Sequence, residues 1–209
     1  MNKEVLKLNV IPLFPSPLGI IDIIEDCSNL KKIITNYDFE PTTGSTSKAC
    51  FITKDLNILE SFPKEKNIIL NYFEIYKNYV LKLDNQKFKM TTSWGTKTEP
   101  GGYSQFHNHQ NCTYSGVFYF DEMSGGNIEF ESYGIYPQQI LLNNPTEWNT
   151  FNSKSWMLTS KKNMLLLFPS YLYHRITENT SLKNRYSLAF NFFPIESFGV
   201  KDSFINISL

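Results

Sequence analysis

The chain has 209 residues, and its 20 lysines and arginines balance its 20 aspartates and glutamates, so the formal net charge is zero. This length suits one domain, since a single hydrophobic core rarely serves more than ~250–300 residues. The balanced charge argues against nucleic acid as a partner, because nucleic-acid binding usually needs a basic excess or patch. With 41% apolar and 15% aromatic residues, the chain can bury a sizeable core and is not typical of a disordered protein.

The same survey argues against membrane insertion and secretion. No apolar run reaches the ~20 residues that a bilayer-spanning helix needs. The N-terminus lacks the continuous apolar stretch and small-residue cleavage site of a secretory signal. Three widely spaced cysteines without a C-x-x-C pair are typical of reduced thiols rather than of a disulfide framework. We therefore expect a cytoplasmic protein that does not enter a membrane.

The first 85 residues predict mixed structure with two helices. Residues 5–14 are prone to form a short strand, and residues 20–35 space their apolar side chains roughly as a helix does. Residues 38–62 are rich in turn-forming residues and indicate a long connection. Pro63 can open a second helix, because proline is accepted at the first helical position, and the apolar spacing continues that helix to Leu83.

From residue 87 onward the pattern changes to short runs of Thr, Tyr, Phe, Ile and Val separated by turn signals such as Lys161-Lys162-Asn163. This pattern predicts eight to ten antiparallel strands in a sandwich or barrel. The fold class is therefore mainly β (α+β) in a single domain, 1–209. Its predicted segments are a helical N-terminal layer (1–85), a β core (86–196) and a C-terminal tail (197–209).

The histidines are the first candidate site. The chain has only three, His107, His109 and His174. If residues 103–111 form a strand, His107 and His109 point to one face and can share a metal ion. His174 follows an apolar, strand-like run, and distant strands meet in a closed sandwich, so it can supply a third ligand. Imidazole ligands suit Fe, Zn, Cu or Ni. The ordinary alternative is that these histidines are surface or hydrogen-bonded structural residues.

The arginines are the second candidate site, because only Arg175 and Arg185 occur and lysine supplies the other 20 − 2 = 18 basic residues. Arg185 and Ser187 share a face of a strand that returns after a hairpin loop, and we expect it beside the strand of His174. A guanidinium next to a hydroxyl can hold a carboxylate through two hydrogen bonds. Arg175 should point away from His174 and serve a structural role. A surface ion pair is the ordinary alternative for Arg185.

Five motifs give the sequence a family resemblance. They are Pro100-Gly101-Gly102-Tyr103, His107-Asn108-His109-Gln110-Asn111, Ser115-Gly116-Val117-Phe118-Tyr119, Leu166-Leu167-Phe168-Pro169-Ser170…His174 and Arg185-Tyr186-Ser187-Leu188-Ala189-Phe190-Asn191. With these motifs the sequence is similar to the 2-oxoglutarate-Fe(II) oxygenases, and most of all to a subfamily with an H-N-H-x-N…S-G-V-x-Y signature that is frequent in marine bacteria and their phages. The resemblance covers most of the chain and is densest from residue 94 to 194.

The resemblance implies a double-stranded β-helix, or jelly roll, with N-terminal helices packed on it and a metal inside its open end. By position, the Fe(II) ligands are His107, His109 and His174. His109 stands where relatives usually carry Asp or Glu, which is a departure from the family pattern. A shifted assignment would place Asn111 in the carboxylate position, although an amide oxygen is the poorer ligand. No catalytic residue beyond the metal centre is implied.

The resemblance also implies how the co-substrate is held. Arg185 and Ser187 match the family position that binds the distal carboxylate of 2-oxoglutarate. Tyr103, Gln105 and Asn111 are further candidates for contacts to the co-substrate or to the metal ligands.

The function implied is a hydroxylase-type dioxygenase that uses Fe(II), 2-oxoglutarate and O₂ on an unknown prime substrate. Two alternatives stay open. One is a cupin-like three-histidine metalloenzyme that does not use 2-oxoglutarate, and the other is a catalytically silent jelly roll used for binding. A homodimer is an ordinary expectation for a chain of this length.

Overall fold

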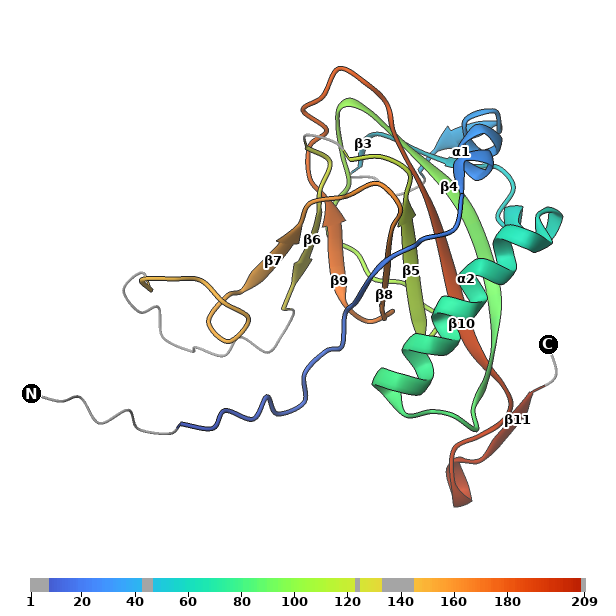
Figure 1. Ribbon diagram of the computed structural model, residues 1–209, viewed down its shortest axis with the longest axis vertical. Coiled ribbons are helices and arrows are strands. Elements are labelled where there is room, and N and C mark those ends of the chain that lie inside the picture. The colour runs from blue at the N-terminus through green and yellow to red at the C-terminus, as the bar shows by residue number, and fades with distance from the viewer. Residues whose placement is uncertain (1–7, 43–46, 123–124, 133–144, 208–209) are drawn as a thin grey trace, which may run out of the picture.

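The computed structural model describes residues 8–42, 47–122, 125–132 and 145–207 (Figure 1). Two antiparallel sheets dominate it, and the smaller has the order β7 (Ser155–Leu158), β6 (Ile128–Glu131), β9 (Tyr173–Ile176). The larger sheet has the order β1 (Gly19–Asp22), β8 (Met164–Pro169), β5 (Tyr114–Tyr119), β10 (Arg185–Phe198), β4 (Lys87–Tyr103), β3 (Lys48–Thr53), β2 (Phe39–Pro41), with β11 (Ile205–Ile207) paired to β10.

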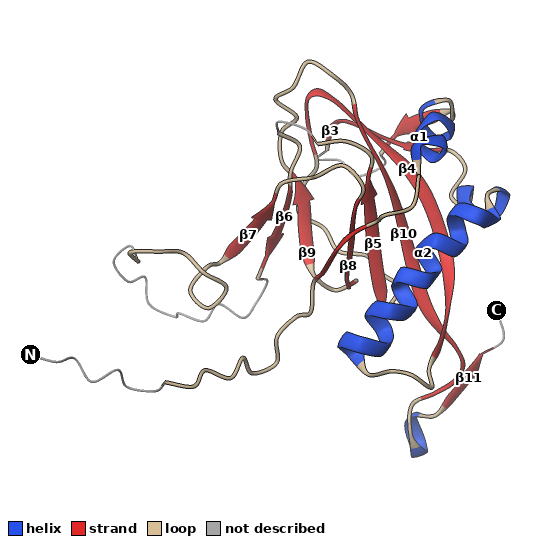
Figure 2. Ribbon diagram, in the orientation of Figure 1, coloured by secondary structure: helices blue, strands red, loops and turns tan. Residues whose placement is uncertain are grey.

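The helices cover one face of the larger sheet, and the smaller sheet lies on its other side (Figure 2). The helices are α1 (Ser28–Thr35) and α2 (Pro63–Tyr76), with short turns η1 (Ile58–Ser61), η2 (Lys77–Leu81) and η3 (Lys201–Ser203). The predicted fold class, a mainly β jelly roll with N-terminal helices packed on it, is confirmed. Among the described residues, no helix is both long and apolar enough to cross a bilayer.

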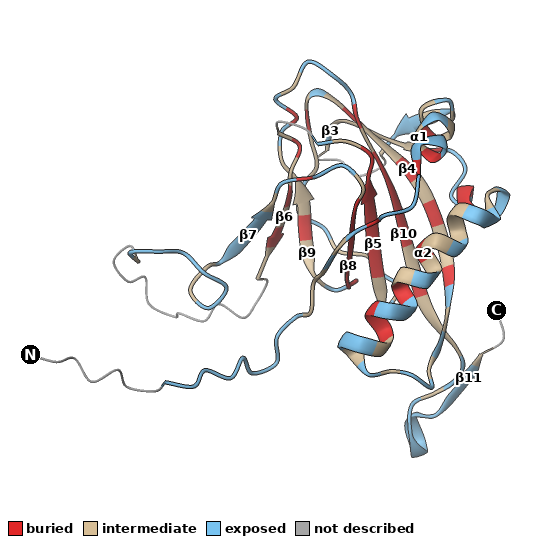
Figure 3. Cartoon of the chain, viewed as in Figure 1, coloured by how far each residue is buried: buried red, intermediate tan, exposed pale blue. Residues whose placement is uncertain are grey.

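Alternation along the central strands builds a separate core on each face of the larger sheet. In β8, Leu165 and Leu167 pack toward the helices, whereas Leu166 and Phe168 pack toward the smaller sheet. Neighbouring side chains of a strand point to opposite faces, so a strand buried on both sides must be apolar throughout. This explains the unbroken apolar run of β8, and Figure 3 shows β5 and β8 as buried segments.

The helix that opens at Pro63 is confirmed. The α-helical part ends at Tyr76, a π-helical turn continues to Leu81, and Lys82 stops it in the left-handed region at φ 55°. Ile69 and Phe73 lie one turn apart on its buried face, and the Phe73 ring stacks on Phe192 of β10 at 3.8 Å. The apolar spacing therefore marks the face that packs on the larger sheet.

The predictions for the rest of the N-terminal region were partly wrong. Residues 20–35 were expected to form one helix, but β1 occupies the start of this range and only α1 is helical. The expected long connection at 38–62 contains β2 and β3, which extend the larger sheet. Residues 8–14 contain no strand, and residues 5–7 lie outside the described part. Pairing with β8 and β4, far along the chain, decides these strands, and no local pattern reveals it.

The segment that leads into β1 is exposed and apolar. Leu8 is 81% exposed, Phe14 is 96% exposed, and Val10, Ile11 and Leu13 between them are also exposed. In Figure 1 this segment runs away from the two sheets. We call residues 8–15 the N-terminal arm.

Candidate metal centre

The two neighbouring histidines lie on a crossing between the sheets. Strand β4 ends at Tyr103, and the expectation that residues 103–111 form one strand was wrong. The backbone N–H and C=O of His107 instead exchange hydrogen bonds of 2.9 and 2.8 Å with those of His174 on β9. Two residues later, the His109 N–H donates to the Ser170 carbonyl at 3.0 Å. Because the backbone hydrogen bonds pass from His174 to Ser170 within three residues, the segment that carries His107 and His109 is a loop and not a strand. This loop still brings the two histidines together.

The three imidazoles form one cluster. The ring centroids of His107 and His174 are 4.5 Å apart, those of His109 and His174 are 5.1 Å apart, and those of His107 and His109 are 5.6 Å apart. One nitrogen from each ring lies within 4.8 Å of the others. Metal–nitrogen distances are ~2.0–2.1 Å, so small side-chain rotations would bring all three nitrogens onto one ion.

Hydrogen bonds prepare two of the rings for metal binding. Nδ1 of His107 lies 2.9 Å from the Gln105 carbonyl, and Nδ1 of His174 lies 2.9 Å from the Leu172 carbonyl. A carbonyl oxygen only accepts, so Nδ1 carries the proton in each ring. The lone pair of the neutral ring is then on Nε2, which is the arrangement found in histidine metal ligands. The residues present therefore fit a metal ion.

Burial keeps two of the rings neutral. The pKa of His109 is lowered to about 4, because burial and, to a smaller extent, the neighbouring His107 lower it by more than the hydrogen bond to Asn191 raises it. His174 is 5% exposed, and its burial, with the nearby His107 and His109, lowers its pKa well below the ordinary value.

These shifts predict how the stability of the metal-free protein depends on pH. In the unfolded chain both imidazoles take up protons near pH 6.5, whereas in the folded protein they stay neutral, so stability falls as the pH falls from about 6.5 toward 4. A shift of this size at His109 corresponds to about 3 kcal/mol. In chelator-treated protein, His109→Gln should flatten the dependence of the unfolding free energy on pH in this window. An unchanged dependence would contradict the prediction.

A narrow apolar cavity of about 140 Å³ lies beside the cluster, between the two sheets. All three histidines line it, together with Ser187, and no aspartate or glutamate of the described residues does so. The lining is mostly apolar, and no described carboxylate lies in it to serve as an anionic metal ligand. Its main apolar lining residues are Trp94, Val117, Phe168, Ile176 and Ala189.

Arg185 is a buried cation next to this cavity. It is 2% exposed, its Nη1 donates to Ser187 Oγ at 3.4 Å, and its guanidinium lies 4.8 Å from the centre of the Tyr119 ring. Among the described residues, its Nε and Nη2 have no hydrogen-bond partner. A buried charge without a counter-ion costs several kcal/mol, so the arrangement calls for an anionic guest. Gly126 permits it, since a Cβ there would lie 2.7 Å from Arg185 Cδ.

Arg185 reaches the site from the opposite side to that predicted. The strands that carry Arg185 and His174 were expected to lie side by side. Instead, Arg185 is on β10, which lies between β5 and β4 in the larger sheet, and His174 is on β9, which belongs to the smaller sheet. The loop between them crosses from one sheet to the other. Arg185 and Ser187 do share a face, as the alternation indicated. Arg175 has the expected structural role, because its Nη2 pairs with Glu129 at 2.8 Å.

The remaining predicted contacts are not part of the cavity lining. Tyr103, Gln105 and Asn111 are absent from the described residues that line it, and the side chains of Gln105 and Asn111 are exposed. Gln105 contributes through its backbone carbonyl. Asn111 adopts a left-handed conformation with φ 58°, so its role is in the turn.

Asn191 is the site residue that sequence reasoning missed. Its Oδ1 lies 2.8 Å from Nδ1 of His109. The signal was present, because residues 185, 187, 189 and 191 alternate onto one face of β10.

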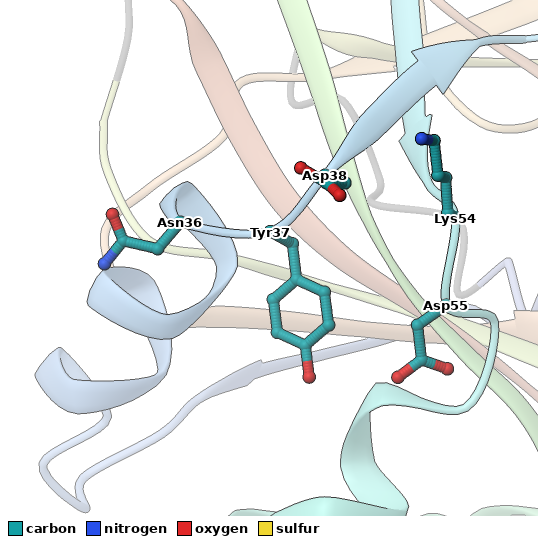
Figure 4. Close-up of a pocket in the computed structure, with 5 residues that line it drawn as sticks. All are labelled: Asn36, Tyr37, Asp38, Lys54 and Asp55. Atoms are coloured by element: carbon teal, nitrogen blue, oxygen red, sulfur yellow. The ribbon is translucent and has the colours of Figure 1, made fainter.

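A second hollow of about 400 Å³ lies elsewhere on the surface (Figure 4). Asn36, Tyr37, Asp38, Lys54 and Asp55 line it, and it shares no residue with the histidine cavity. It is an open surface feature without a metal-binding group of residues.

The fold and the site together define a jelly-roll protein with a cluster of three histidines that could hold a metal ion and a buried arginine next to the same cavity. Residues 92–191 contain all of these groups, and they match the family described as "Putative 2OG-Fe(II) oxygenase". This part of the chain belongs to the 2-oxoglutarate-Fe(II) oxygenase family. The enzymes of this family use Fe(II), 2-oxoglutarate and O₂.

Solved structures of low sequence identity share the fold. HygX from Streptomyces hygroscopicus, solved with nickel and 2-oxoglutarate bound, is 11% identical with a TM-score of 0.57, and the match covers 86% of this chain and 83% of HygX. A Pseudomonas putida prolyl-4-hydroxylase is 12% identical with a TM-score of 0.54, covering 85% and 92%. The epimerase SnoN from nogalamycin biosynthesis is 7% identical with a TM-score of 0.59, covering 85% and 78%. The search of curated proteins found no match.

Proposed function

We propose that the chain is a hydroxylase-type dioxygenase dependent on Fe(II) and 2-oxoglutarate, with His107, His109 and His174 as the iron ligands. The observation that carries this proposal is the buried Arg185, which has two unpartnered nitrogens and contacts Ser187 and Tyr119 in the lining of the cavity that the three histidines share. A metal site alone would not require a buried cation. A metal site next to an anion site suits a co-substrate that has a metal-binding end and a second carboxylate.

The chain's own residues have separate tasks. Arg185 and Ser187 hold the distal carboxylate of 2-oxoglutarate, and the Tyr119 ring supports the guanidinium. Trp94 and Phe168 keep water from the cavity. When bound, the iron supplies oxidative chemistry, in which 2-oxoglutarate and O₂ become succinate and CO₂ while a C–H bond of the prime substrate is hydroxylated. His107 is the exposed member of the cluster and marks the side open to solvent.

Anaerobic titration tests the proposal. Fe(II) and 2-oxoglutarate added together should give the weak visible charge-transfer band of a bidentate chelate, and each alone should not. Admitting O₂ together with a reductant such as ascorbate should then yield succinate and CO₂ slowly even without a prime substrate, because the reductant takes up the oxidising equivalents that substrate hydroxylation would consume. Absence of both the band and succinate would overturn the proposal.

A second candidate, a cupin-like metalloenzyme that does not use 2-oxoglutarate, is favoured by the three neutral ligands. It predicts a stable metal complex whose activity is indifferent to the loss of Arg185. A chain that binds no metal at all would instead act as a binding jelly roll, and metal analysis of protein prepared without chelator distinguishes this outcome.

The setting of the proposed enzyme rests on simpler features. We propose a cytoplasmic location, which the three free cysteines support because reduced thiols persist in reducing compartments. The prime substrate is not a nucleic acid in this proposal, since the chain has no excess of positive charge.

We further propose that the protein is a homodimer in which the N-terminal arm of each copy packs on the other. Zero net charge removes long-range repulsion between copies. A stable interface buries roughly 1,200–2,000 Å² in total, and each arm would bring five exposed apolar side chains to it. Pro12 and Pro15 restrict the backbone of the arm, which lowers the entropic cost of docking.

The dimer can be tested by light scattering after size exclusion. The double substitution Leu13→Asp and Phe14→Asp should change the measured mass from two chains to one. Val200→Asp, at another exposed apolar residue far along the chain, is the matched control and should leave the dimer intact. A parent protein that is already monomeric at tens of micromolar would contradict the proposal.

A further inference from the structure

His109 is held differently from the other two histidines. His107 and His174 each use the backbone carbonyl two residues earlier in the chain. Nδ1 of His109 instead contacts two side chains of the larger sheet, with Asn191 Oδ1 on β10 at 2.8 Å and Ser115 Oγ on β5 at 2.9 Å. Every residue of the loop has a backbone carbonyl, so a carbonyl partner does not depend on the sequence. A side-chain partner requires a particular residue type at a particular position.

The partners of His109 belong to one row across the larger sheet. In the strand register, Asn191 of β10 is opposite Ser115 of β5 and opposite Thr92 of β4. Directly opposite residues in antiparallel strands point to the same face, so these three polar side chains meet in the interior. The register of the β10–β4 pairing shifts between Asn191 and Phe192. Ser170, in the turn after β8, adds a fourth side chain through a 2.8 Å contact with Ser115 Oγ.

The row has one consistent arrangement of protons. Asn191 Nδ2 donates to Thr92 Oγ1 at 3.1 Å, so Oδ1 faces His109 and Ser115. Ser115 Oγ donates to this Oδ1 at 2.8 Å and can accept from Ser170. The amide oxygen can only accept, so Nδ1 of His109 must carry the ring proton and Nε2 must carry the lone pair. With the amide reversed, its N–H would face Nδ1, the proton would move to Nε2, and the ring could no longer bind a metal.

We propose that Asn191 is the positioning residue of the metal centre. It fixes the tautomer and orientation of His109 from the row Thr92–Asn191–Ser115, with Ser170 completing the row. An amide acceptor leaves the His109 imidazole neutral, so the row presents Nε2 of His109 as the third metal ligand. A carboxylate in that position would need no hydrogen bond to fix a tautomer. This inference rests on the proposed metal site, but its tautomer test does not require bound metal.

The first experiment measures tautomers in metal-free protein by two-bond ¹⁵N–¹H NMR of the imidazole rings. Wild-type His109 should show a single Nδ1–H tautomer. In Asn191→Ala this preference should be lost, and in Asn191→Asp, which keeps the acceptor oxygen, it should persist. A wild-type His109 protonated on Nε2 would overturn the inference, whether or not the protein binds metal.

The second experiment measures Co(II) affinity by competition with a chelator. Asn191→Ala should weaken binding 10–100-fold, the usual effect of removing a hydrogen bond behind a metal ligand. Asn191→Asp should restore affinity to within a few-fold of wild type, and Ser115→Ala should give a smaller loss than Asn191→Ala. The matched control is Asn78→Ala, a half-buried asparagine in η2.

The outcomes separate the two proposals. If wild-type protein binds no Co(II), the proposed function fails, while the NMR result still decides the inference. If it binds Co(II) and Asn191→Ala is folded with unchanged affinity and tautomer, the inference alone fails. If circular dichroism shows that Asn191→Ala is unfolded, Ser115→Ala is used in its place. Unchanged Co(II) affinity and an unchanged His109 tautomer in Ser115→Ala would then overturn the proposed role of the row.

Discussion

Replacing Arg185 with methionine should weaken 2-oxoglutarate binding by at least about 30-fold. Loss of one partner from a buried, hydrogen-bonded charge pair typically costs 2–5 kcal/mol, and each 1.4 kcal/mol is a factor of ten. The methionine fills much of the same volume and removes the guanidinium that contacts Ser187 and Tyr119 in the cavity lining. Isothermal titration of the metal-loaded protein with 2-oxoglutarate measures the change.

The same substitution should stabilise the free protein. Without an anionic guest, the guanidinium is a buried charge with two unpartnered nitrogens, and replacing such a charge by an apolar side chain often stabilises by about 1–4 kcal/mol. Thermal melts should therefore show a higher midpoint for Arg185→Met, together with the loss of the midpoint increase that 2-oxoglutarate gives to the parent.

Arg175→Gln is the matched control for both effects. It removes the other arginine, which pairs with Glu129 on the outer side of β9 and is partly exposed. It should leave 2-oxoglutarate affinity unchanged. Wild-type affinity in Arg185→Met would mean that the co-substrate carboxylate binds elsewhere, and would favour the cupin-like alternative.

His174→Ala should reduce metal affinity on the order of a thousandfold, well beyond the 10–100-fold loss expected for an outer hydrogen bond. His174 is the most buried of the three rings and lies closest to His107, so the two remaining histidines alone leave the ion open to water and to exchange. Competition between Co(II)-loaded protein and a chelator measures the loss, and the 2-oxoglutarate charge-transfer band should vanish with it.

The control for His174→Ala lies one residue away. Arg175→Gln changes the next position of β9, whose side chain points to the other face, and it should retain full metal affinity. Retention of tight metal binding by His174→Ala would show that the cluster is not the metal site.

Local patterns predicted the parts of the fold that depend on neighbours in sequence. Apolar spacing identified the helix from Pro63, because a helix needs only partners three or four residues away. Alternation placed Arg185 and Ser187 on one face. Asn163, in the turn signal at residues 161–163, has a positive φ of 62°. Gly116 lets the Phe190 ring approach the backbone closely, since a Cβ there would lie 2.2 Å from that ring.

Features that depend on distant pairing were not predictable in the same way. The histidine pair was assigned to a strand, yet its backbone bonds to His174 and Ser170 on the far side of the site. Strand β3 forms by pairing with the edge of β4, and β2 forms by pairing with β3. Asn191 acquires its role only from the register that sets it opposite Ser115 and Thr92. Such pairings are set by the assembled sheet, so a single sequence does not display them.

The position of β10 has a consequence for biosynthesis. This strand is central to the larger sheet, with β5 on one side and β4 on the other, yet it follows both of them in the chain. Strands β4 and β5 therefore leave the ribosome long before the partner that joins them, and their unpaired edges must be kept from aggregating until then. Arg185, Ser187 and Asn191 all arrive with β10. A prematurely terminated chain would lack the centre of its sheet and half of its site together, and degradation is the outcome that we expect for it.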